Sequence, residues 1–211
     1  MWEVIEKHKT ALPESVSAYR EYKPYLREEA NKKCVYCAIN ESYLGGADSF
    51  HVEHFRPKSL DSFKHLIKEY SNLFYTCAIC NRFKSNDWPA DPNERFDIPF
   101  YIDPNLNNYN DFFKLSADYT ILGNNIPALY MIERINLNRP QLINARRETF
   151  LRKAFPSIYQ IFNDLLNDLV DLNDERGKEL LKEALELIQK IMNLWSSEKD
   201  SSQYEPDEIK R

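Results

Sequence analysis

Two stripes of hydrophobic residues run through the last third of the chain at the spacing of an α-helix. Apolar side chains recur every three or four positions, first from residue 151 to 169 and then from 181 to 195. This spacing gathers them on one face of each helix. Because the segment LNDERG between the stripes is polar, the pattern predicts a helical hairpin. The stripes consist of Leu151, Phe155, Ile158, Phe162, Leu165 and Leu169, and then Leu181, Leu185, Ile188, Ile191 and Trp195.

The first part of the chain has shorter elements. Residues 14–31 have the pattern of a helix, and residues 49–55 alternate apolar with polar positions, which predicts a short strand ending near Pro57. The run CNRFKSN from Cys80 predicts the first turns of a short helix. These elements alternate with loops, so we expect a small mixed α and β core.

The middle of the chain is loop-rich. Residues 85–110 contain many Pro, Asn and Asp and predict a long loop. Residues 112–125 predict a β-hairpin that turns near Ala117-Asp118. Asn125 is a predicted helix cap with Pro127 in the first turn, and a further helix is predicted from about Pro140.

All four cysteines fall in two C-x-x-C pairs, Cys34 with Cys37 and Cys77 with Cys80. Two such turns can direct four thiolates at one tetrahedral zinc ion. The alternatives are a redox pair, disulfides or buried free thiols. A redox motif leaves the second pair unexplained, and disulfides are rare in cytosolic proteins. We therefore expect structural zinc, with the 39 residues between the pairs held as one insert.

Composition and charge limit the function classes. The 211 residues are 43% hydrophobic and 29% charged, and the net charge is −5. Residues 31–84 carry eight Lys or Arg against five Asp or Glu, whereas residues 163–211 carry seven against thirteen. A local basic face can attract phosphates although the whole chain is acidic. No apolar run is long enough for a membrane span, and the N-terminus lacks a secretory signal, so a cytoplasmic protein is expected.

The insert contains the run FHVEHFRPKS, with His51, Glu53 and His54 close together. Hydrolysis of a phosphodiester needs a base for water and a cation near the leaving oxygen. A neutral histidine suits the first role at pH 7, which favours His54. Hard divalent cations prefer oxygen ligands, which Glu53 and Asn81 offer.

Four elements of the insert together resemble the HNH endonucleases, also called ββα-metal or His-Me finger nucleases. The resemblance implies that His54 is the general base, that Glu53 and Asn81 hold a catalytic Mg²⁺ or Mn²⁺, and that Asn72 orients the histidine through the backbone. The family more often has Asp and His at the positions of Glu53 and Asn81, which leaves open the metal preference and whether His51 is a further ligand. The elements are Cys34-Val-Tyr-Cys37, VEHFRPKS from Val52, Asn72-Leu73 and CAICNRFK from Cys77.

Four basic residues flank this run, namely Arg56, Lys58, Arg82 and Lys84. They are candidates for contacts with the phosphate backbone, which supplies most of the non-specific affinity for nucleic acid. The alternative is that they are ordinary solvated charges.

We expect an α+β fold: a helical segment at 1–33, a zinc-stapled nuclease core at 34–125, a helical region at 126–195 and a flexible tail at 196–211. In length and layout the chain is most similar to the HNH subunit of Septu-type or retron-associated anti-phage systems, which implies an ATPase partner. DNA is the favoured substrate. The alternatives are cleavage of a structured RNA such as tRNA, or a catalytically inert zinc-folded adaptor. The helical hairpin is expected either to dock the partner or to pack on the core.

Overall fold

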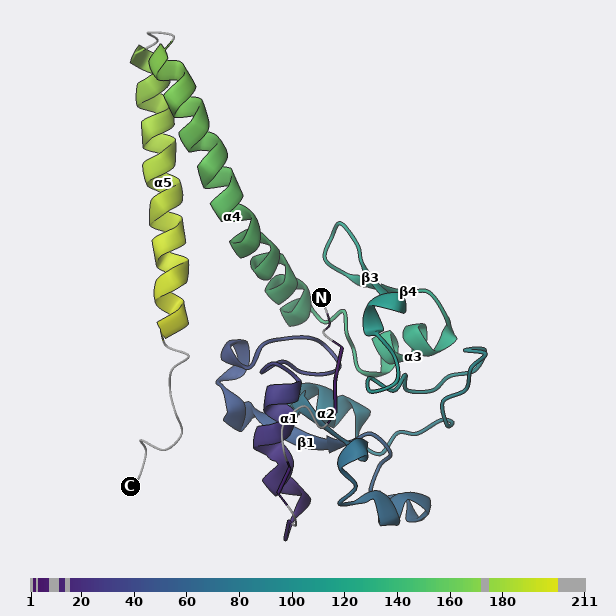
Figure 1. Cartoon of the computed structure of the whole chain (residues 1–211). Coiled ribbons are helices and arrows are strands. Elements are labelled where there is room, and N and C mark those ends of the chain that lie inside the picture. Colours follow the sequence, from purple (N-terminus) through teal and green to yellow (C-terminus); the bar gives the residue numbers. More distant parts are fainter. Residues whose placement is uncertain (1, 3, 8–11, 14–15, 172–174, 201–211) are drawn as a thin grey trace. The chain divides into compact units, whose positions relative to one another are not determined.

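The computed structural model describes residues 2, 4–7, 12–13, 16–171 and 175–200. Its contacts divide the chain into two units, Met1–Ile143 and Asn144–Arg211. Small antiparallel sheets and helices make up the first unit, and helices make up the second (Figure 1). The helices and strands are α1 (Lys23–Glu29), β1 (Phe50–His54), β2 (Leu73–Cys77), α2 (Ala78–Lys84), β3 (Phe113–Leu115), β4 (Ile121–Gly123), α3 (Ile126–Arg134), α4 (Pro140–Asp171) and α5 (Glu175–Asp200).

The centre of the first unit is an antiparallel pair of strands followed at once by a helix. β1 pairs with β2 in a register that places Phe50 opposite Cys77 and His54 opposite Leu73. Both α1 and α2 contact this pair. The predicted strand at 49–55 and the predicted helix after Cys80 are therefore confirmed as β1 and α2, although α2 begins two residues earlier.

Aromatic packing fixes this β-hairpin. Every residue of β2 is buried, so the strand LFYTC is a core strand without a solvent face. The rings of Phe50 and Tyr75 are stacked with centroids 4.7 Å apart. The rings of Phe55 and Phe74 make a further edge contact. The burial of such rings is the main source of stability in a small core.

The segment before the first cysteine pair is less helical than its sequence pattern predicts. A 3-10 helix at Tyr19–Tyr22 precedes α1, which has Pro24 in its first turn. The α-helix ends at Glu29, and Asn31 and Lys32 both have positive φ angles, of 48° and 58°. The predicted helix over 14–31 is thus too long, and residues 14 and 15 lie outside the described residues.

The middle region follows the sequence pattern. Residues 85–108 contain no helix or strand, and β3 and β4 form the expected hairpin. Asn125 caps α3 by accepting a hydrogen bond from the amide of Ala128 at 2.9 Å. Gly123 is required where β4 approaches α3, because a Cβ there would lie 2.9 Å from the Leu129 backbone nitrogen.

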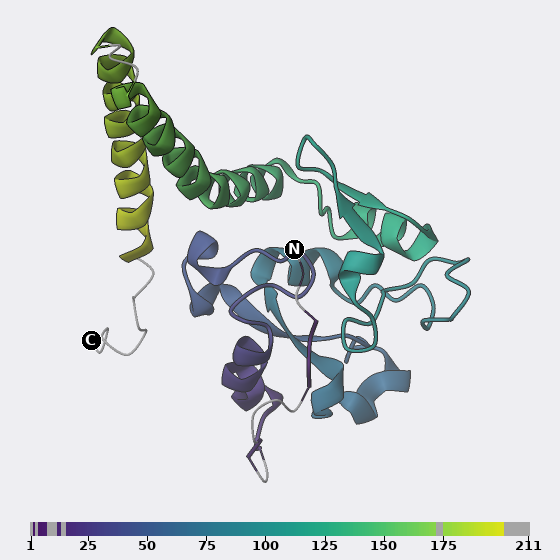
Figure 2. The same ribbon diagram turned by 45° about the horizontal axis from the view of Figure 1, so that its top comes forward.

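In the second unit, α5 runs antiparallel to the later part of α4 (Figure 2). The two predicted helices are thereby confirmed, whereas residues 172–174 of their predicted connection lie outside the described residues. Pro156 lies within α4 without ending it. The stripe residues Leu169 and Trp195 have side chains outside the described part. Among the described residues, no helix is both long enough and apolar enough to cross a membrane.

Candidate functional site

A cavity of about 720 Å³ lies along β1 and the start of the following loop. The polar side chains that line it come from three separate parts of the sequence: the segment before the first cysteine pair, the β1 region and the end of α2. Five of the predicted site residues are among them. The polar and charged lining residues are Tyr19, Arg20, Lys23, His51, Glu53, His54, Lys58, Ser59, Asn81, Ser85 and Asn86.

His54 is held in one orientation by a backbone carbonyl. Its Nε2 lies 3.0 Å from the carbonyl oxygen of Ile67. Because a carbonyl oxygen only accepts hydrogen bonds, Nε2 carries the proton of the neutral ring and Nδ1 is the basic nitrogen. Burial lowers the pKa of His54, partly offset by this hydrogen bond. The side chain is therefore neutral at pH 7.

Tyr19 packs its ring against the histidine from outside the insert. The two rings make an edge contact with centroids 4.6 Å apart. The Tyr19 hydroxyl accepts a hydrogen bond of 2.6 Å from Lys58, which lowers the pKa of the tyrosine. One tyrosine thus contacts both His54 and a cation of the cavity wall.

Asn72 braces the backbone around His54. Its Oδ1 accepts a 2.8 Å hydrogen bond from the amide of Arg56, and its Nδ2 donates to the carbonyl of the same residue at 3.1 Å. The same Nδ2 lies 3.5 Å from the carbonyl oxygen of Leu66, next to the Ile67 carbonyl that holds the histidine. Asn72 therefore joins the two segments that fix the ring.

Glu53 is almost completely buried and forms an ion pair with Lys84. Its Oε1 lies 2.7 Å from the Lys84 Nζ, and the lysine side chain is fully buried. The same ammonium donates to the carbonyl of His54 at 3.2 Å. Burial raises the pKa of Glu53, while the charge of Lys84 opposes that change.

The side chains of His51, in β1, and Asn81, in α2, lie within hydrogen-bond distance of each other. The Nδ2 of Asn81 lies 3.2 Å from the Nδ1 of His51, and the pair faces solvent. Since a half-turn of an amide exchanges its oxygen and nitrogen, Asn81 can present Oδ1 at this position. Strand alternation puts His51 and Glu53 on one side of β1. The carboxylate of Glu53, the imidazole of His51 and the amide of Asn81 therefore line one cavity.

The basic residues predicted to contact phosphate are placed very differently. Lys58 lines the cavity. Arg56 lies 3.5 Å from Asp91 and over the Trp88 ring, and Arg82 is exposed beside its neighbour Phe83. The side chain of Lys84 has no exposed surface and forms an ion pair with Glu53 inside the protein.

Two further cations of the cavity wall were not predicted from the sequence. Arg20 lies in the 3-10 helix Tyr19–Tyr22 and Lys23 is the first residue of α1, about thirty residues before β1 in the sequence. Their spacing of three positions places them on one side of a helical segment. Because that spacing is common on solvated helices, it does not connect these two residues with His54.

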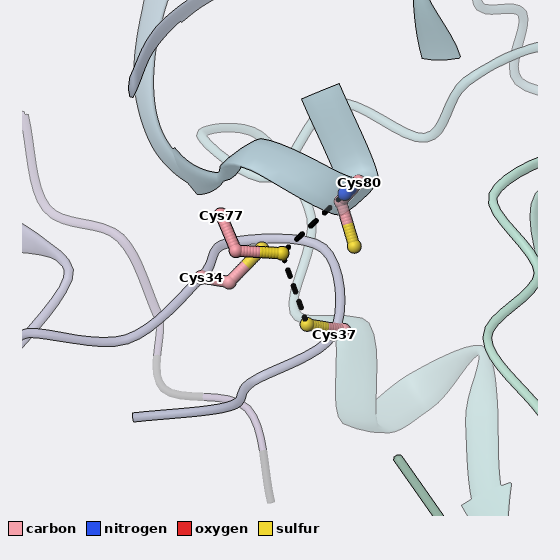
Figure 3. A group of neighbouring side chains, drawn as sticks. All are labelled: Cys34, Cys37, Cys77 and Cys80. Carbon is pink, nitrogen blue, oxygen red and sulfur yellow. Dashed lines mark hydrogen bonds between the residues drawn. The ribbon is translucent and has the colours of Figure 1, made fainter. Parts of the chain in front are cut away.

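The four cysteines converge from two turns (Figure 3). All four are buried, and their sulfur atoms lie within 4.8 Å of one another. Cys77 caps α2 by accepting a hydrogen bond from the amide of Cys80. The first pair lies in a turn closed by a hydrogen bond from the Cys34 amide to the carbonyl of Ile39 at 2.9 Å.

This cluster has the dimensions of a tetrahedral metal site. Zinc bound to four thiolates at about 2.3 Å would separate neighbouring sulfurs by about 3.8 Å, and the sulfurs of Cys37 and Cys77 are 4.0 Å apart. Burial raises the pKa of the Cys34 and Cys80 thiols, and a bound cation would favour their thiolate forms. The donor set therefore fits one metal ion.

Comparison with known proteins agrees with this geometry. Residues 34–87 match the family model described as HNH endonuclease. No curated protein and no solved structure matches the chain. The matched segment begins at Cys34 and includes β1, β2, α2 and all four cysteines. The segment that carries the cysteine cluster, β1 and Asn81 is therefore similar to the HNH endonucleases, and this supports a nuclease activity.

Proposed function

We propose that this protein is a metal-dependent endonuclease that hydrolyses phosphodiester bonds at the cavity beside β1. The observation that carries the proposal is that Glu53, His54 and Asn81 line one cavity within the segment that matches the HNH model. These side chains combine a neutral imidazole with two oxygen donors. The combination suits attack of water on a phosphate.

In this proposal His54 is the general base. Its Nδ1 takes a proton from the attacking water, while Nε2 stays bound to the Ile67 carbonyl. Asn72 acts as a positioning residue, since it holds the backbone on both sides of the ring. Tyr19 limits the movement of the ring from the other side.

Glu53 and Asn81 are the proposed ligands of a catalytic Mg²⁺ or Mn²⁺, and the ring of His51 lies where it could add a nitrogen ligand. Hard cations accept carboxylate and amide oxygens, which is what these two residues provide. When bound, the cation would supply positive charge to the scissile phosphate and the leaving oxygen. The positive charge of Lys84 opposes the rise that burial causes in the pKa of Glu53.

The substrate is held by the cations around the cavity. We include Arg20, Lys23 and Lys58 because they line the cavity from two sides. Arg56 and Arg82 remain candidates for more distant phosphates, whereas Lys84 is assigned to Glu53. We take DNA as the first substrate, with structured RNA such as tRNA as the alternative.

At the level of the system, we propose a nuclease subunit of an ATPase-coupled anti-phage complex. The support is the sequence similarity in length and layout described above, together with a second unit made of two helices with exposed apolar side chains. The cysteine cluster would hold structural zinc. The expected location is the cytoplasm.

The direct test is cleavage by the purified full chain. Supercoiled plasmid, linear duplex DNA and tRNA are each incubated with Mg²⁺ or Mn²⁺ and with EDTA. We expect metal-dependent cutting of DNA that EDTA abolishes. Cutting of tRNA alone would assign the enzyme to RNA. No cutting of any substrate, with or without the co-expressed partner, would favour the inert adaptor.

A further inference from the structure

The guanidinium of Arg139 lies against the cysteine cluster. Its Nη2 is 3.5 Å from the Cys80 Sγ and 4.0 Å from the Cys77 Sγ. Its Nη1 points the other way and donates to the carbonyls of Ile135 and Asn136, at 3.4 and 3.2 Å. Only 6% of the residue is exposed. The side chain therefore bridges the turn after α3 and the two sulfurs at the start of α2.

A buried arginine needs a source of negative charge. Its guanidinium stays protonated in proteins, and a buried cation without a counter-charge is strongly destabilising. Among the described residues, the side chain of Arg139 donates to two backbone carbonyls and to these two sulfurs and lies over the Phe83 ring. No carboxylate of that part of the chain forms an ion pair with it. The negative charge beside Arg139 must then come from the cysteines.

A buried metal site with four thiolates also needs a counter-charge. Four thiolates around one divalent cation leave a net charge of −2 in a buried place. One guanidinium offsets half of that charge, and its N–H groups are donors that thiolate sulfur accepts. Two groups that are each unfavourable when buried alone are therefore placed in contact.

We propose that Arg139 is a positioning residue of the metal centre, which donates hydrogen bonds to the thiolates of Cys77 and Cys80 and balances the charge of the tetrathiolate site. The proposal rests on the zinc site proposed above and is independent of catalysis at His54. It also connects the metal centre to a segment of the chain that contains none of the four cysteines. Through Arg139 the metal site fastens the end of α3, and Arg139 directly precedes α4.

The test compares the full chain with three variants. Arg139→Gln removes the charge, Arg139→Lys keeps it without the planar fork, and Arg147→Gln removes an exposed arginine from α4 as a matched control. Zinc content is measured by elemental analysis, and zinc release is followed with a chromogenic chelator. We expect about one zinc per wild-type chain, and a release that is about 10- to 100-fold faster in Arg139→Gln, the usual range for a lost partner of a metal ligand. Arg139→Lys should be intermediate and Arg147→Gln unchanged.

A spectroscopic readout separates this role from general support of the fold. In the cobalt-substituted protein, the thiolate-to-cobalt charge-transfer band should move to lower energy in Arg139→Gln, because the sulfur lone pairs lose a hydrogen-bonded cation. If Arg139→Gln does not fold, the band and release rate of Arg139→Lys decide the question. A zinc-loaded variant with wild-type release and an unchanged band would overturn the role of Arg139. Wild-type protein without zinc would overturn the metal centre itself, whatever its nuclease activity.

Discussion

At the scale of single residues, burial shifts the pKa values of two neighbouring residues of β1, Glu53 and His54, in opposite directions. Burial lowers the pKa of His54 and raises that of Glu53, because both shifts favour the uncharged form. The neutral form is the useful one for a base, but the charged form is the useful one for a metal ligand. The protein resolves this by giving only Glu53 a buried cation, Lys84.

The first prediction concerns His54. His54→Ala should lower the cleavage rate at least about 100-fold, the lower end of what a general base contributes. Zinc content should not change, since His54 is not part of the cysteine cluster. Single-turnover cleavage is the measurement, and His65→Ala, an exposed histidine of the neighbouring loop, is the control. Cutting at the wild-type rate would show that another group is the base.

The second prediction is the pH dependence of cleavage. The active form of His54 is neutral, so activity is present above its pKa and lost as the pH falls through it. Since burial places that pKa below the ordinary 6.5, the rate at saturating metal should fall toward low pH with a midpoint below pH 6.5. The logarithm of kcat/KM is measured between about pH 5 and 8. A midpoint above 6.5 would contradict a buried neutral base.

At the scale of elements, the Glu53–Lys84 pair joins β1 to α2 inside the core. Lys84→Met should lower the free energy of unfolding by about 3–5 kcal/mol, because it leaves a buried carboxylate unpaired. Glu53→Gln combined with Lys84→Met should recover part of the loss. Urea unfolding followed by tryptophan fluorescence gives the values, with Lys64→Met as the exposed control. If the double variant were no more stable than Lys84→Met, the pair would not be the cause.

The fourth prediction concerns Arg20, in the 3-10 helix before α1, and Lys23, the first residue of α1. In a His54→Ala background, Arg20→Ala with Lys23→Ala should weaken nucleic-acid binding and reduce the salt slope by about two, since each phosphate contact contributes about 0.9 for duplex DNA. Fluorescence anisotropy at several salt concentrations is the measurement. Lys114→Ala removes an exposed cation on β3, away from the cavity lining, and should change neither quantity. An unchanged salt slope in the double variant would show that Arg20 and Lys23 do not contact the substrate.

These elements also show what the sequence could and could not predict. Local patterns were sufficient for β1, α2, the β3–β4 hairpin and the cap of α3, since alternation, spacing and capping act over a few residues. They could not separate Lys84 from Lys58, because charge alone does not tell a buried lysine from a solvated one. Arg20, Lys23 and Arg139 depend on packing between distant segments, which a single sequence does not display.

At the scale of the whole molecule, charge and chemistry are divided between the two units. The cavity, its cations and the cysteine cluster lie in residues 1–143, whereas residues 144–211 carry eleven basic against fourteen acidic residues. A net negative charge disfavours contact with phosphate. We therefore propose that the exposed apolar side chains of the second unit contact protein rather than nucleic acid.

The last prediction is that the α4–α5 hairpin holds the ATPase partner. Leu180 and Leu187 are each 60% exposed and lie seven positions apart, hence on one face of α5. Leu180→Glu with Leu187→Glu should prevent co-purification of an ATPase when the tagged chain is co-expressed with the products of its neighbouring genes, because a carboxylate cannot be buried in an apolar contact without a large penalty. Lys182→Glu makes the same change in net charge on the same helix without removing an apolar group, and should leave the complex intact. Zinc content and DNA binding should match the wild type in all variants. A double variant that still recovers the ATPase in full, or that loses DNA binding instead, would show that the hairpin has another role.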